Sequence, residues 1–487
     1  MKGNLLKVMS FLIAASMVMT ACATAATPTQ PPAAVPTTPP VAGQPTTPPA
    51  AAPTAAGCKD ADRVPINWST IAGFYTDAMN TIVAGFEATH CVKVTIVGID
   101  NSQLYDKQII EAVGNTGAYD VYTMETAEKA GFAESGYILP MDDYITAHPE
   151  VDYADVAPIL ADITTRYKGH IWGLPYYTYT QGQFFRQDLF DDPTEQAAFK
   201  AAYGYDLKPP QTWDQVTDMA KFFTRKVGDK LKGVVLTKPF YGIGLMAGPY
   251  QEIQDELLGM IIWKGSDLLA NDGTITVNDA ANLWALQFYV DKLLPYAPPA
   301  ATTVTYDGVM NQMQDCQIAM TANFFLDQWP NAAKTEKSCP GAVMGIGEGI
   351  EKTVYVGAFL LGVSSASKHP QEAFDFVAYV GGKEAQTSFA KMGGSTTRIS
   401  VLSDPQFNTP ESRPFTGHFA TLLKVFANMT GKNSNLFYSP FGAKLYNAEG
   451  LIEHEAAVHE KTPAQALQEL YDTWVQICGG PICTVNK

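Results

Sequence analysis

The sequence has little positive charge. It contains 33 Lys and Arg residues against 49 Asp and Glu residues, so its formal net charge at pH 7 is −16. Proteins that bind nucleic acid or dock electrostatically on anionic lipid present basic faces. We therefore expect no nucleic-acid partner and no electrostatic docking on lipid. Acidity by itself indicates little more than solubility.

The sequence also lacks the short motifs that mark common catalytic sites. It contains no G-x-S-x-G, no Walker glycine loop and no G-x-G-x-x-G that opens a helix after a strand. In HEAAVH, His454 and His459 stand too far apart to share one side of a helix as in HExxH. The glycines of GIGEGI lead into another strand-like run, and no carboxylate pair stands out as general acid and base. We therefore predict neither an enzyme nor a bound cofactor.

Long apolar runs are absent beyond the N-terminus, where only a short one occurs. Lys2 and Lys7 precede or flank FLIAASMVM, which has the length of a signal-peptide core and is too short to span a bilayer. We interpret residues 1–21 as an export signal peptide. The following tetrapeptide MTAC resembles the bacterial lipobox, with Met where leucine is usual, so Cys22 is the expected lipidation site. The alternative is an ordinary secretory signal followed by a chance cysteine.

Charged and aromatic residues are completely absent from Ala23 to Gly57, where proline recurs every few positions. Such a composition cannot bury a core and favours an extended spacer of about 3.1 Å per residue, on the order of 100 Å in all. We interpret residues 22–57 as a tether. The expected location is the outer face of the cytoplasmic membrane, at the cell surface or in the periplasm of an exported bacterial lipoprotein.

Six cysteines remain after Cys22, and an even number in an exported chain permits disulfides with many alternative connectivities. The sequence around each cysteine narrows the choice of disulfide pairs. The first four cysteines lie beside strand-like runs (VPINW, CVKVTIVGI, CQIAMT and CPGAVMGI), and CGGPIC is a short loop that could close on itself. We predict the pairs Cys58–Cys91, Cys316–Cys339 and Cys478–Cys483. Zinc is the alternative, but the spacings are not paired CxxC, so no metal is predicted.

Strand-like and helix-like runs alternate after Cys58. Between VPINW and CVKVTIVGI, Met79, Ile82, Val83 and Phe86 recur with helical spacing, which predicts a βαβ unit. A length prior of about 150 residues per domain suggests two or three domains. We expect an α/β fold with mostly parallel sheets flanked by helices.

Two later helices have recognisable ends. Thr212 and Gln215 fit a capping box ahead of the apolar stripe in WDQVTDMAKFF. Pro370 suits the first turn of a second helix, which paired glycines would end.

One stretch is unusually rich in aromatic residues. GLPYYTYTQGQFFRQDLF, residues 173–190, is similar to the segment of extracellular solute-binding proteins where the chain crosses between two lobes. AYDVYTMETAEKAGFAESGYILPMDDYI before it and PPQTWDQVTDMAKF after it resemble further landmarks of that family. CQIAMTANFFLDQW, VGAFLLGVSSASKHPQEAFDFVAYV and MGGSTTRISVLSDP follow in the same order. The chain thus resembles the maltose-binding-protein-like family 1 of carbohydrate ABC importers over nearly all of residues 58–487.

The resemblance implies a two-lobed periplasmic-binding-protein-like fold of type II, with a ligand cleft between lobes and a hinge of several chain crossings. Crossings are expected near Pro175–Tyr179, Ala342–Gly345 and Met392–Arg398. The implied N-terminal lobe comprises residues 58–175 and 343–393, and the C-terminal lobe comprises residues 179–340 and 397–487.

The resemblance also implies the ligand contacts. A sugar needs flat aromatic platforms for its C–H faces and planar polar groups for its hydroxyls. The positions carried over from the family, with Trp263 added as a further platform, are Ser69, Thr70, Tyr75, Met124, Glu125, Tyr177, Tyr179, Trp263, Phe325, Asp327, Trp329, Gly357, Phe359 and Arg398. Glu125, Asp327 and Arg398 would make the polar contacts, and Met124 stands where the family often has an aromatic platform. The alternatives are a core position for Phe325, Phe359 or Trp263 and a structural salt link for Arg398.

The implied function is that of the substrate-binding subunit of an ABC transporter. It would capture a sugar, oligosaccharide or polyol and deliver it to membrane permease subunits, as a lipid-anchored monomer. Two alternatives remain open: a surface glycoside hydrolase, which needs carboxylates about 5 to 10 Å apart across the cleft, and a sugar-sensing or adhesion lipoprotein. The sequence does not identify the sugar.

Overall fold

The computed structural model describes residues 58–487, apart from the side chains of residues 74–77. These residues belong to one compact unit, residues 51–487. The predicted signal peptide, the lipidation site Cys22 and the whole tether lie outside the described residues. From residue 58 onward, none of the helices combines the length and the apolar composition that a membrane crossing requires.

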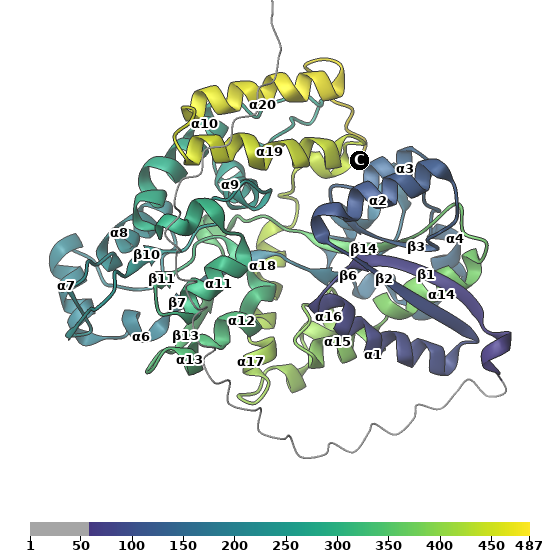
Figure 1. The fold of residues 1–487 in the computed structure, drawn as a ribbon, viewed down its shortest axis with the longest axis horizontal. Helices are drawn as coiled ribbons and strands as arrows, with labels where there is room; N and C mark the ends of the chain where they lie inside the picture. The colour runs from purple at the N-terminus through teal and green to yellow at the C-terminus, as the bar shows by residue number, and fades with distance from the viewer. Residues whose placement is uncertain (1–57) are drawn as a thin grey trace, which may run out of the picture. The chain divides into compact units, whose positions relative to one another are not determined.

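The first sheet has five strands in the order β2-β1-β3-β14-β6 (Figure 1). Its strands are β1 (Val64–Ile71), β2 (Val92–Ile99), β3 (Val121–Glu125), β6 (Leu174–Thr178) and β14 (Ala358–Val363). β1 pairs in parallel with β2 and β3, whereas β14 runs antiparallel to β3 and β6. Helix α1 (Phe74–Thr89) connects β1 to β2 and buries Met79, Ile82 and Phe86, which confirms the predicted βαβ unit.

Helices cover both faces of this sheet. Figure 1 shows α1, α14 and α15 on one side and α2 and α3 on the other. The helices of this part are α2 (Asn101–Gly114), α3 (Lys129–Glu134), α4 (Asp142–Ala147), α5 (Pro158–Leu160), α14 (Pro370–Gly381), α15 (Lys383–Lys391) and α16 (Ile399–Leu402), and Arg166–Tyr167 (β4) pairs with His170–Ile171 (β5). Pro370 opens α14 and Gly382 follows its last residue, as predicted.

The second sheet is built around β7. Its order is β10-β11-β7-β12, and β13 also pairs with β7. The strands are β7 (Gln181–Arg186), β10 (Tyr241–Ile243), β11 (Ile318–Met320), β12 (Phe324–Phe325) and β13 (Met344–Gly347). β10 and β11 are parallel, but all pairings of β7 are antiparallel. Both sheets are therefore mixed. The pairs β1–β2, β1–β3 and β10–β11 are parallel, as expected, and the other pairs in these two sheets are antiparallel.

The second sheet is surrounded by the remaining helices. They are α6 (Gln187–Phe190), α7 (Pro193–Tyr203), α8 (Trp213–Phe223), α9 (Glu252–Trp263), α10 (Ala280–Phe288), α11 (Tyr306–Gln314), α12 (Trp329–Ala333), α13 (Thr335–Ser338), α17 (Arg413–Thr416), α18 (Phe419–Met429), α19 (Gly442–Ala457) and α20 (Pro463–Cys478), with a small hairpin of β8 (Lys230–Leu231) and β9 (Val234–Val235). Thr212 caps α8 by accepting from the backbone N–H of Gln215, but the Gln215 side chain accepts from Gln211. Only half of the predicted capping box therefore forms.

The chain passes between the sheets at points that differ partly from expectation. It leaves β6 at Thr178 and enters β7 at Gln181, beside the first predicted crossing. The second prediction, near Ala342–Gly345, is wrong, because β13 still pairs with β7. The passage back lies between Gly347 and Ala358, so the segment assigned to the N-terminal lobe from residue 343 begins too early. An apolar strand pattern predicts a strand but not the sheet that it joins.

The structure joins Cys58 to Cys91, Cys316 to Cys339 and Cys478 to Cys483. These are the three pairings that the sequence predicts. The first ties the start of β1 to the start of β2. The second joins the segment before β11 to the segment before β13, and the third closes the loop after α20.

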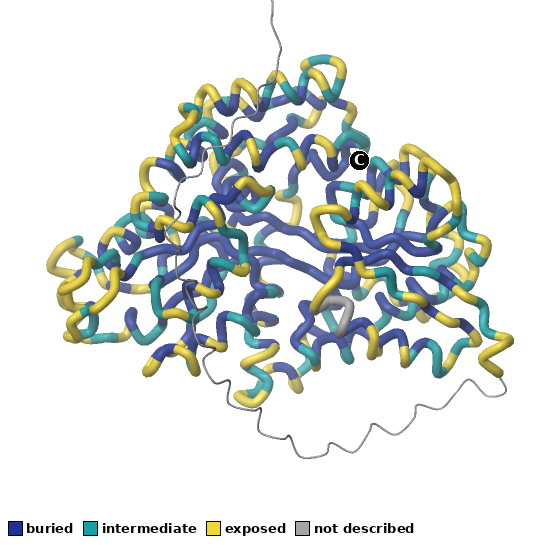
Figure 2. The backbone as a smooth tube through the Cα atoms, viewed as in Figure 1, coloured by how far each residue is buried: buried dark blue, intermediate teal, exposed yellow. Residues whose placement is uncertain are grey.

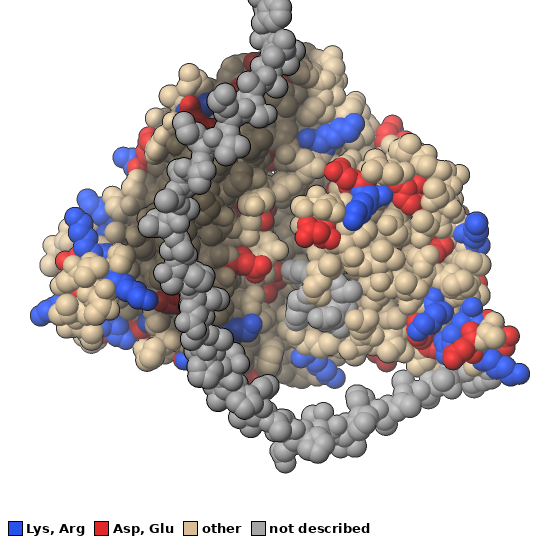
Figure 3. All heavy atoms as spheres, in the orientation of Figure 1, with Lys and Arg blue, Asp and Glu red and all other residues tan. Residues whose placement is uncertain are grey.

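The apolar core runs along both sheets. Figure 2 shows the strands of both sheets as buried backbone, with exposed positions on the outer helices and loops. Trp68, Trp329 and Trp474 are the largest of the fully buried side chains. On the face drawn in Figure 3, Lys and Arg side chains are scattered and do not gather in one patch.

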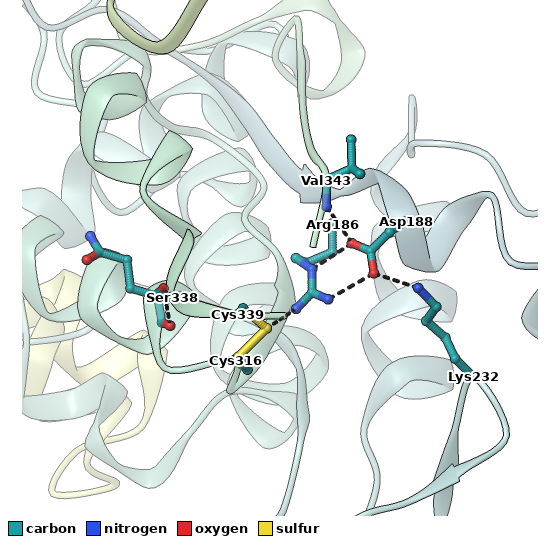
Figure 4. Close-up of a disulfide and its surroundings, with 8 residues drawn as sticks. Arg186, Asp188, Lys232, Cys316, Ser338, Cys339 and Val343 are labelled. Atoms are coloured by element: carbon teal, nitrogen blue, oxygen red, sulfur yellow. Dashed lines mark hydrogen bonds and ion pairs between the residues drawn. A yellow bond between two sulfur atoms is a disulfide. The ribbon is translucent and has the colours of Figure 1, made fainter. Parts of the chain in front are cut away.

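A buried ion pair holds the end of β7. Arg186 donates to Asp188 through Nε (2.7 Å) and Nη2 (2.9 Å), and each side chain is 6 % exposed. Its Nη1 also donates to Cys339 Sγ (3.1 Å). Asp188 further accepts from Lys232 Nζ (2.9 Å) and from the backbone N–H of Val343 (3.1 Å) (Figure 4). The pair thus connects β7, the second disulfide and the segment that leads into β13.

Candidate functional site

A cleft of about 670 Å³ lies between elements of the two sheets. From the first sheet it is lined by residues at or beyond the ends of β1, β2 and β3 and by β14. From the second it is lined by β12, the short helix after β12 and the first turns of α9 and α11, and α19 completes the wall. Ligand sites of α/β proteins commonly lie beyond the carboxyl ends of parallel strands, which is the edge used here by β1 to β3.

Aromatic rings form a continuous apolar floor in this cleft. Tyr177 stacks on Phe359 with ring centroids 5.9 Å apart, and Tyr179 lies 4.9 Å from Phe359 and 6.0 Å from Phe325. Tyr306 extends the row, 6.3 Å from Phe325. The first four rings are at most 9 % exposed, so each is fixed by packing and presents only part of its surface to the cleft.

Asp327 lies in the short helix Leu326–Gln328 that follows β12. Its Oδ2 accepts hydrogen bonds from the Tyr177 hydroxyl and from Gln328 Nε2 (3.0 Å), whereas Oδ1 is buried without a partner among the described residues. Burial raises the pKa of Asp327 to about 6. This carboxylate therefore has one acceptor atom available at the floor of the cleft.

Glu125 ends β3 and faces the same cleft from the first sheet. Its backbone N–H donates to Glu128 Oε2 (2.8 Å), which brings two glutamates to this edge. Burial, and then the nearby charges of Glu128 and Glu252, raises the pKa of Glu125 well above 4.5. Burial raises the pKa of Glu128 to about 7.

Two further carboxylates enter from α9. Asp255 is 2 % exposed, and the Tyr446 hydroxyl of α19 lies 2.9 Å and 3.0 Å from its two oxygens. Burial, followed by the charge of Glu252, raises the pKa of Asp255 well above its usual value. Oε2 of Glu252 is buried and has no hydrogen-bond partner within the described part of the chain.

The structure brings six of the predicted contact residues together in the cleft lining: Glu125, Tyr177, Tyr179, Phe325, Asp327 and Phe359. Gly357 lies behind them, and its carbonyl accepts from the Tyr179 N–H (3.1 Å). A Cβ at Gly357 would stand 2.3 Å from the Tyr179 ring, so glycine is what lets this ring pack closely. Tyr75 lies in the first turn of α1, and its side chain is outside what the structure describes.

Three predicted residues next to the cleft are buried instead. Ser69 accepts from Gln108 Nε2 (2.8 Å), and the Thr70 hydroxyl lies 3.4 Å from the Tyr176 hydroxyl. Met124 is fully buried in an apolar cluster with Phe132. Because neighbouring side chains of a strand point to opposite faces, Glu125 in the cleft places Met124 on the other side. None of the three lines the cleft.

The remaining predictions also need correction, because the structure places these residues away from the cleft lining. Trp329 is fully buried, packs on Phe184 and donates its ring N–H to a backbone carbonyl, so it is a core residue. Arg398 is 1 % exposed and donates to the carbonyls of residues 151, 152 and 381. Trp263 ends α9, 5.5 Å from Trp284, and is 38 % exposed. Its amphipathic helix position favoured the core, but it lies at the surface.

Sequence reasoning missed several residues of the lining. Asp100 directly follows β2, and its place at the end of a strand, like that of Glu125 in β3, is the signal that could have found it. Glu252 and Tyr306 stand at the first positions of α9 and α11, where polar and aromatic residues have ordinary structural roles. Asp255 and Tyr446 lie inside helices, and their meeting depends on how α9 packs against α19.

Sequence comparisons identify the family. A model of the family described as bacterial extracellular solute-binding protein matches residues 74–387. A probable ABC transporter-binding protein of Deinococcus radiodurans is 26 % identical over 322 residues, which are 64 % of this chain and 70 % of that protein. An arabinooligosaccharide-binding protein of Halalkalibacterium halodurans is 20 % identical over 425 residues, 83 % of this chain and 87 % of that protein.

Solved structures show the same fold. An ABC transporter solute-binding protein of Agrobacterium radiobacter in complex with ribitol has a TM-score of 0.69 at 20 % identity, covering 84 % of this chain and 97 % of that chain. A maltose-bound protein of T. maritima has a TM-score of 0.66 at 17 % identity, covering 84 % and 98 %. The architecture is thus the predicted α/β fold of type II periplasmic binding proteins. The family model matches more than half of this chain, residues 74–387, so the chain belongs to the family of bacterial extracellular solute-binding proteins.

Proposed function

We propose that the protein is the substrate-binding subunit of an ABC transporter and that it captures a sugar, oligosaccharide or polyol in the cleft. The observation that carries this proposal is the combination of an aromatic floor with acceptor carboxylates from both sheets, Glu125 and Asp327. Rings can lie against the C–H face of a sugar while carboxylates accept from its hydroxyls. The cleft volume of about 670 Å³ is in the range of small-molecule sites. The ribitol and arabinooligosaccharide named for relatives are of this ligand class.

The proposal can be tested by a thermal-shift screen of the full chain against monosaccharides, arabino-oligosaccharides, maltodextrins, ribitol and other polyols. A ligand that binds only the folded state stabilises it by about 2.7 kcal/mol at a hundred times Kd. Asp327→Asn should weaken binding, because the amide has only one oxygen and can no longer accept from the protein with one oxygen and from the ligand with the other. Asp206→Asn, at an exposed ion pair, is the control and should bind normally. A panel in which no sugar or polyol shifts the unfolding temperature contradicts the proposal.

The role of a binding subunit implies that the ligand leaves unchanged and passes to permease subunits. Incubation with excess ligand, followed by mass spectrometry, should recover the ligand intact, without hydrolysis products. Turnover of a glycoside would instead favour a surface hydrolase. A ligand that is bound but not imported by cells that contain the permease would favour a sensing or adhesion role.

We further propose that Cys22 carries a lipid and that residues 22–57 tether a monomeric binding domain to the membrane. Several acyl chains on one cysteine anchor a protein far better than a single chain. Cys22→Ala should therefore appear in the soluble fraction or keep its signal peptide, as measured by fractionation and mass spectrometry. Membrane retention of a fully processed Cys22→Ala protein would show that the anchor lies elsewhere.

A further inference from the structure

The cleft lining is acidic and lacks a compensating cation. Among the described residues that line it there are seven carboxylate side chains and no Lys, Arg or His. The seven are Asp100, Asp106, Glu125, Glu128, Glu252, Asp255 and Asp327. They come from both sides. The first four lie at the end of β3, just after β2 or β3, or in α2, and the other three belong to α9 and the segment after β12. On the face drawn in Figure 3, red acidic side chains stand inside and beside the central hollow.

Asp255 gives an independent sign of a missing donor. It is 98 % buried and lines the cleft, and both of its oxygens face the single hydroxyl of Tyr446, at 2.9 Å and 3.0 Å. A phenol has one proton to donate, so the two oxygens of Asp255 share a single donor in these contacts. Buried acceptors are almost always satisfied in folded proteins. The arrangement therefore has room for a donor that the protein itself does not supply.

Two other carboxylates have the same property. Asp327 Oδ1 and Glu252 Oε2 are buried and have no hydrogen-bond partner in the described part of the chain. Each lines the cleft, and they come from different elements. The unsatisfied acceptors are thus spread across the wall and floor of one cavity and are not a defect of a single loop.

Charge distinguishes between two kinds of donor. Beside a neutral sugar, burial and mutual repulsion favour the protonated form of these carboxyl groups, which then accept less well from hydroxyls. An ammonium group satisfies the same acceptors with three donors and also compensates the charge. The rings of Tyr306 and Phe325 beside these carboxylates add the attraction of an aromatic face for a cation.

Resting on the proposed function, we propose that the cleft selects a carbohydrate or polyol that bears a positive charge, an amino sugar or amino polyol, over the neutral compound of the same shape. Glu252 and Asp255, which lie one turn apart on α9, receive the ammonium group, and Asp327 accepts from a hydroxyl of the same ligand. The aromatic floor receives the carbon skeleton. The remaining carboxylates raise the local concentration of cations through the field that they create.

The test is calorimetric titration of the full chain at pH 7 and low salt with three matched pairs of probes. These are D-glucosamine with D-glucose, 1-amino-1-deoxy-D-sorbitol with D-sorbitol, and de-N-acetylated chito-oligosaccharides with cello-oligosaccharides of equal length. We expect the charged member of at least one pair to bind about tenfold more tightly or better, with a preference that falls as salt is added. N-acetyl-D-glucosamine, which keeps the sugar ring and the nitrogen but carries no charge, should bind no more tightly than glucose.

Variants then test whether the carboxylates of the cleft recognise the positive charge of the probe. Glu252→Gln and Asp255→Asn should each reduce affinity for the charged probe by more than for its neutral partner. Glu384→Gln, an exposed residue of α15, is the matched control and should keep the full preference. Thermal unfolding of each variant checks its fold, and Glu252→Gln remains informative if the buried Asp255→Asn does not fold.

Three outcomes overturn the inference. If neutral probes bind as tightly as charged ones, the carboxyl groups hold protons and the proposed function stands without charge selection. If the preference survives both cleft substitutions, the cation binds elsewhere. If neither member of any pair binds and the broader sugar and polyol screen is also negative, the proposed function fails as well, which separates the two failures.

Discussion

At the scale of single residues, the buried pair of Arg186 and Asp188 is the sharpest test of what holds the second sheet together. Asp188→Ala should lower the free energy of unfolding by about 3 to 5 kcal/mol, because it leaves the buried Arg186 without its counter-charge. Urea denaturation measures this. Asp206→Ala removes an exposed partner of Lys200 and should change stability by less than about 1 kcal/mol. Equal effects of the two variants would contradict the assigned role.

A second residue-scale prediction concerns pH. Glu256 is 4 % exposed and accepts from Tyr289 (2.6 Å) and from the Met246 N–H (2.9 Å), and burial raises its pKa from 4.5 to about 8. Between these values the unfolded chain releases the proton and the folded chain keeps it. Its contribution to stability is therefore complete below about pH 4.5 and is lost as pH rises through about 8.

Glu256→Gln cannot ionise, so its stability relative to the parent should increase between pH 5 and pH 8. Chemical denaturation at several pH values provides the measurement, with the exposed Glu384→Gln as the control that follows the parent. A constant difference between Glu256→Gln and the parent across this range would show that Glu256 does not titrate there. Buried neighbours such as Glu453 and Glu449 also have raised pKa values, so the parent keeps part of its pH dependence in the variant.

Trp329 shows that residue type alone does not distinguish a ligand contact from a core residue. A tryptophan that follows an FFLD segment was expected to stack on sugar, yet it is fully buried against Phe184. Phe325 and Asp327 precede it in the same segment, and both line the cleft. Residue type predicts that a ring will be buried, but the ring can be buried equally well by ligand or by protein.

At the scale of elements, α20 begins with a full capping box, whereas α8 has only half of one. Thr462 accepts from the Gln465 N–H, and the Gln465 side chain accepts from the Thr462 N–H, so the box encloses Pro463 in the first turn. Thr462→Ala should cost about 1 kcal/mol of stability. Thr462→Ser keeps the hydroxyl and should retain most of it. Urea midpoints compare the two, and an Ala variant as stable as the Ser variant would argue that the cap contributes nothing.

The prediction of elements succeeded where local signals were sufficient. The βαβ unit from β1 to β2 has both apolar alternation and a helical stripe, and both strands and the helix formed as expected. The capping box at Thr212 was only half right, because Gln215 found a second backbone N–H within reach at Gln211. The run near Met344 forms a strand, as predicted, but this strand joins the second sheet and not the first. Local periodicity indicates which face of an element is buried, but it does not indicate which other element packs against that face.

At the scale of the whole molecule, the cleft is formed by side chains from both sheets, so a bound ligand contacts both at once only when the two sides are close. Binding energy should therefore favour a closed state. Small-angle scattering should show a smaller radius of gyration when a ligand found by the screen is added at saturation. The same concentration should have less effect on Asp327→Asn. An unchanged radius at saturation would exclude closure as the signal to the permease.

The sequence by itself determined the α/β class, the three cysteine pairs, the family and six side chains of the cleft, because each depends on short patterns or on an ordered set of landmarks. Only the tertiary structure decided that Trp329 and Trp263 lie outside the cleft lining, where the chain returns to the first sheet, and that α9 and α19 bring Asp255 to Tyr446. The physical reason is that periodicity reports burial along one element. Convergence of distant elements depends on packing among all of them, and the acidity of the cleft is a property of that convergence.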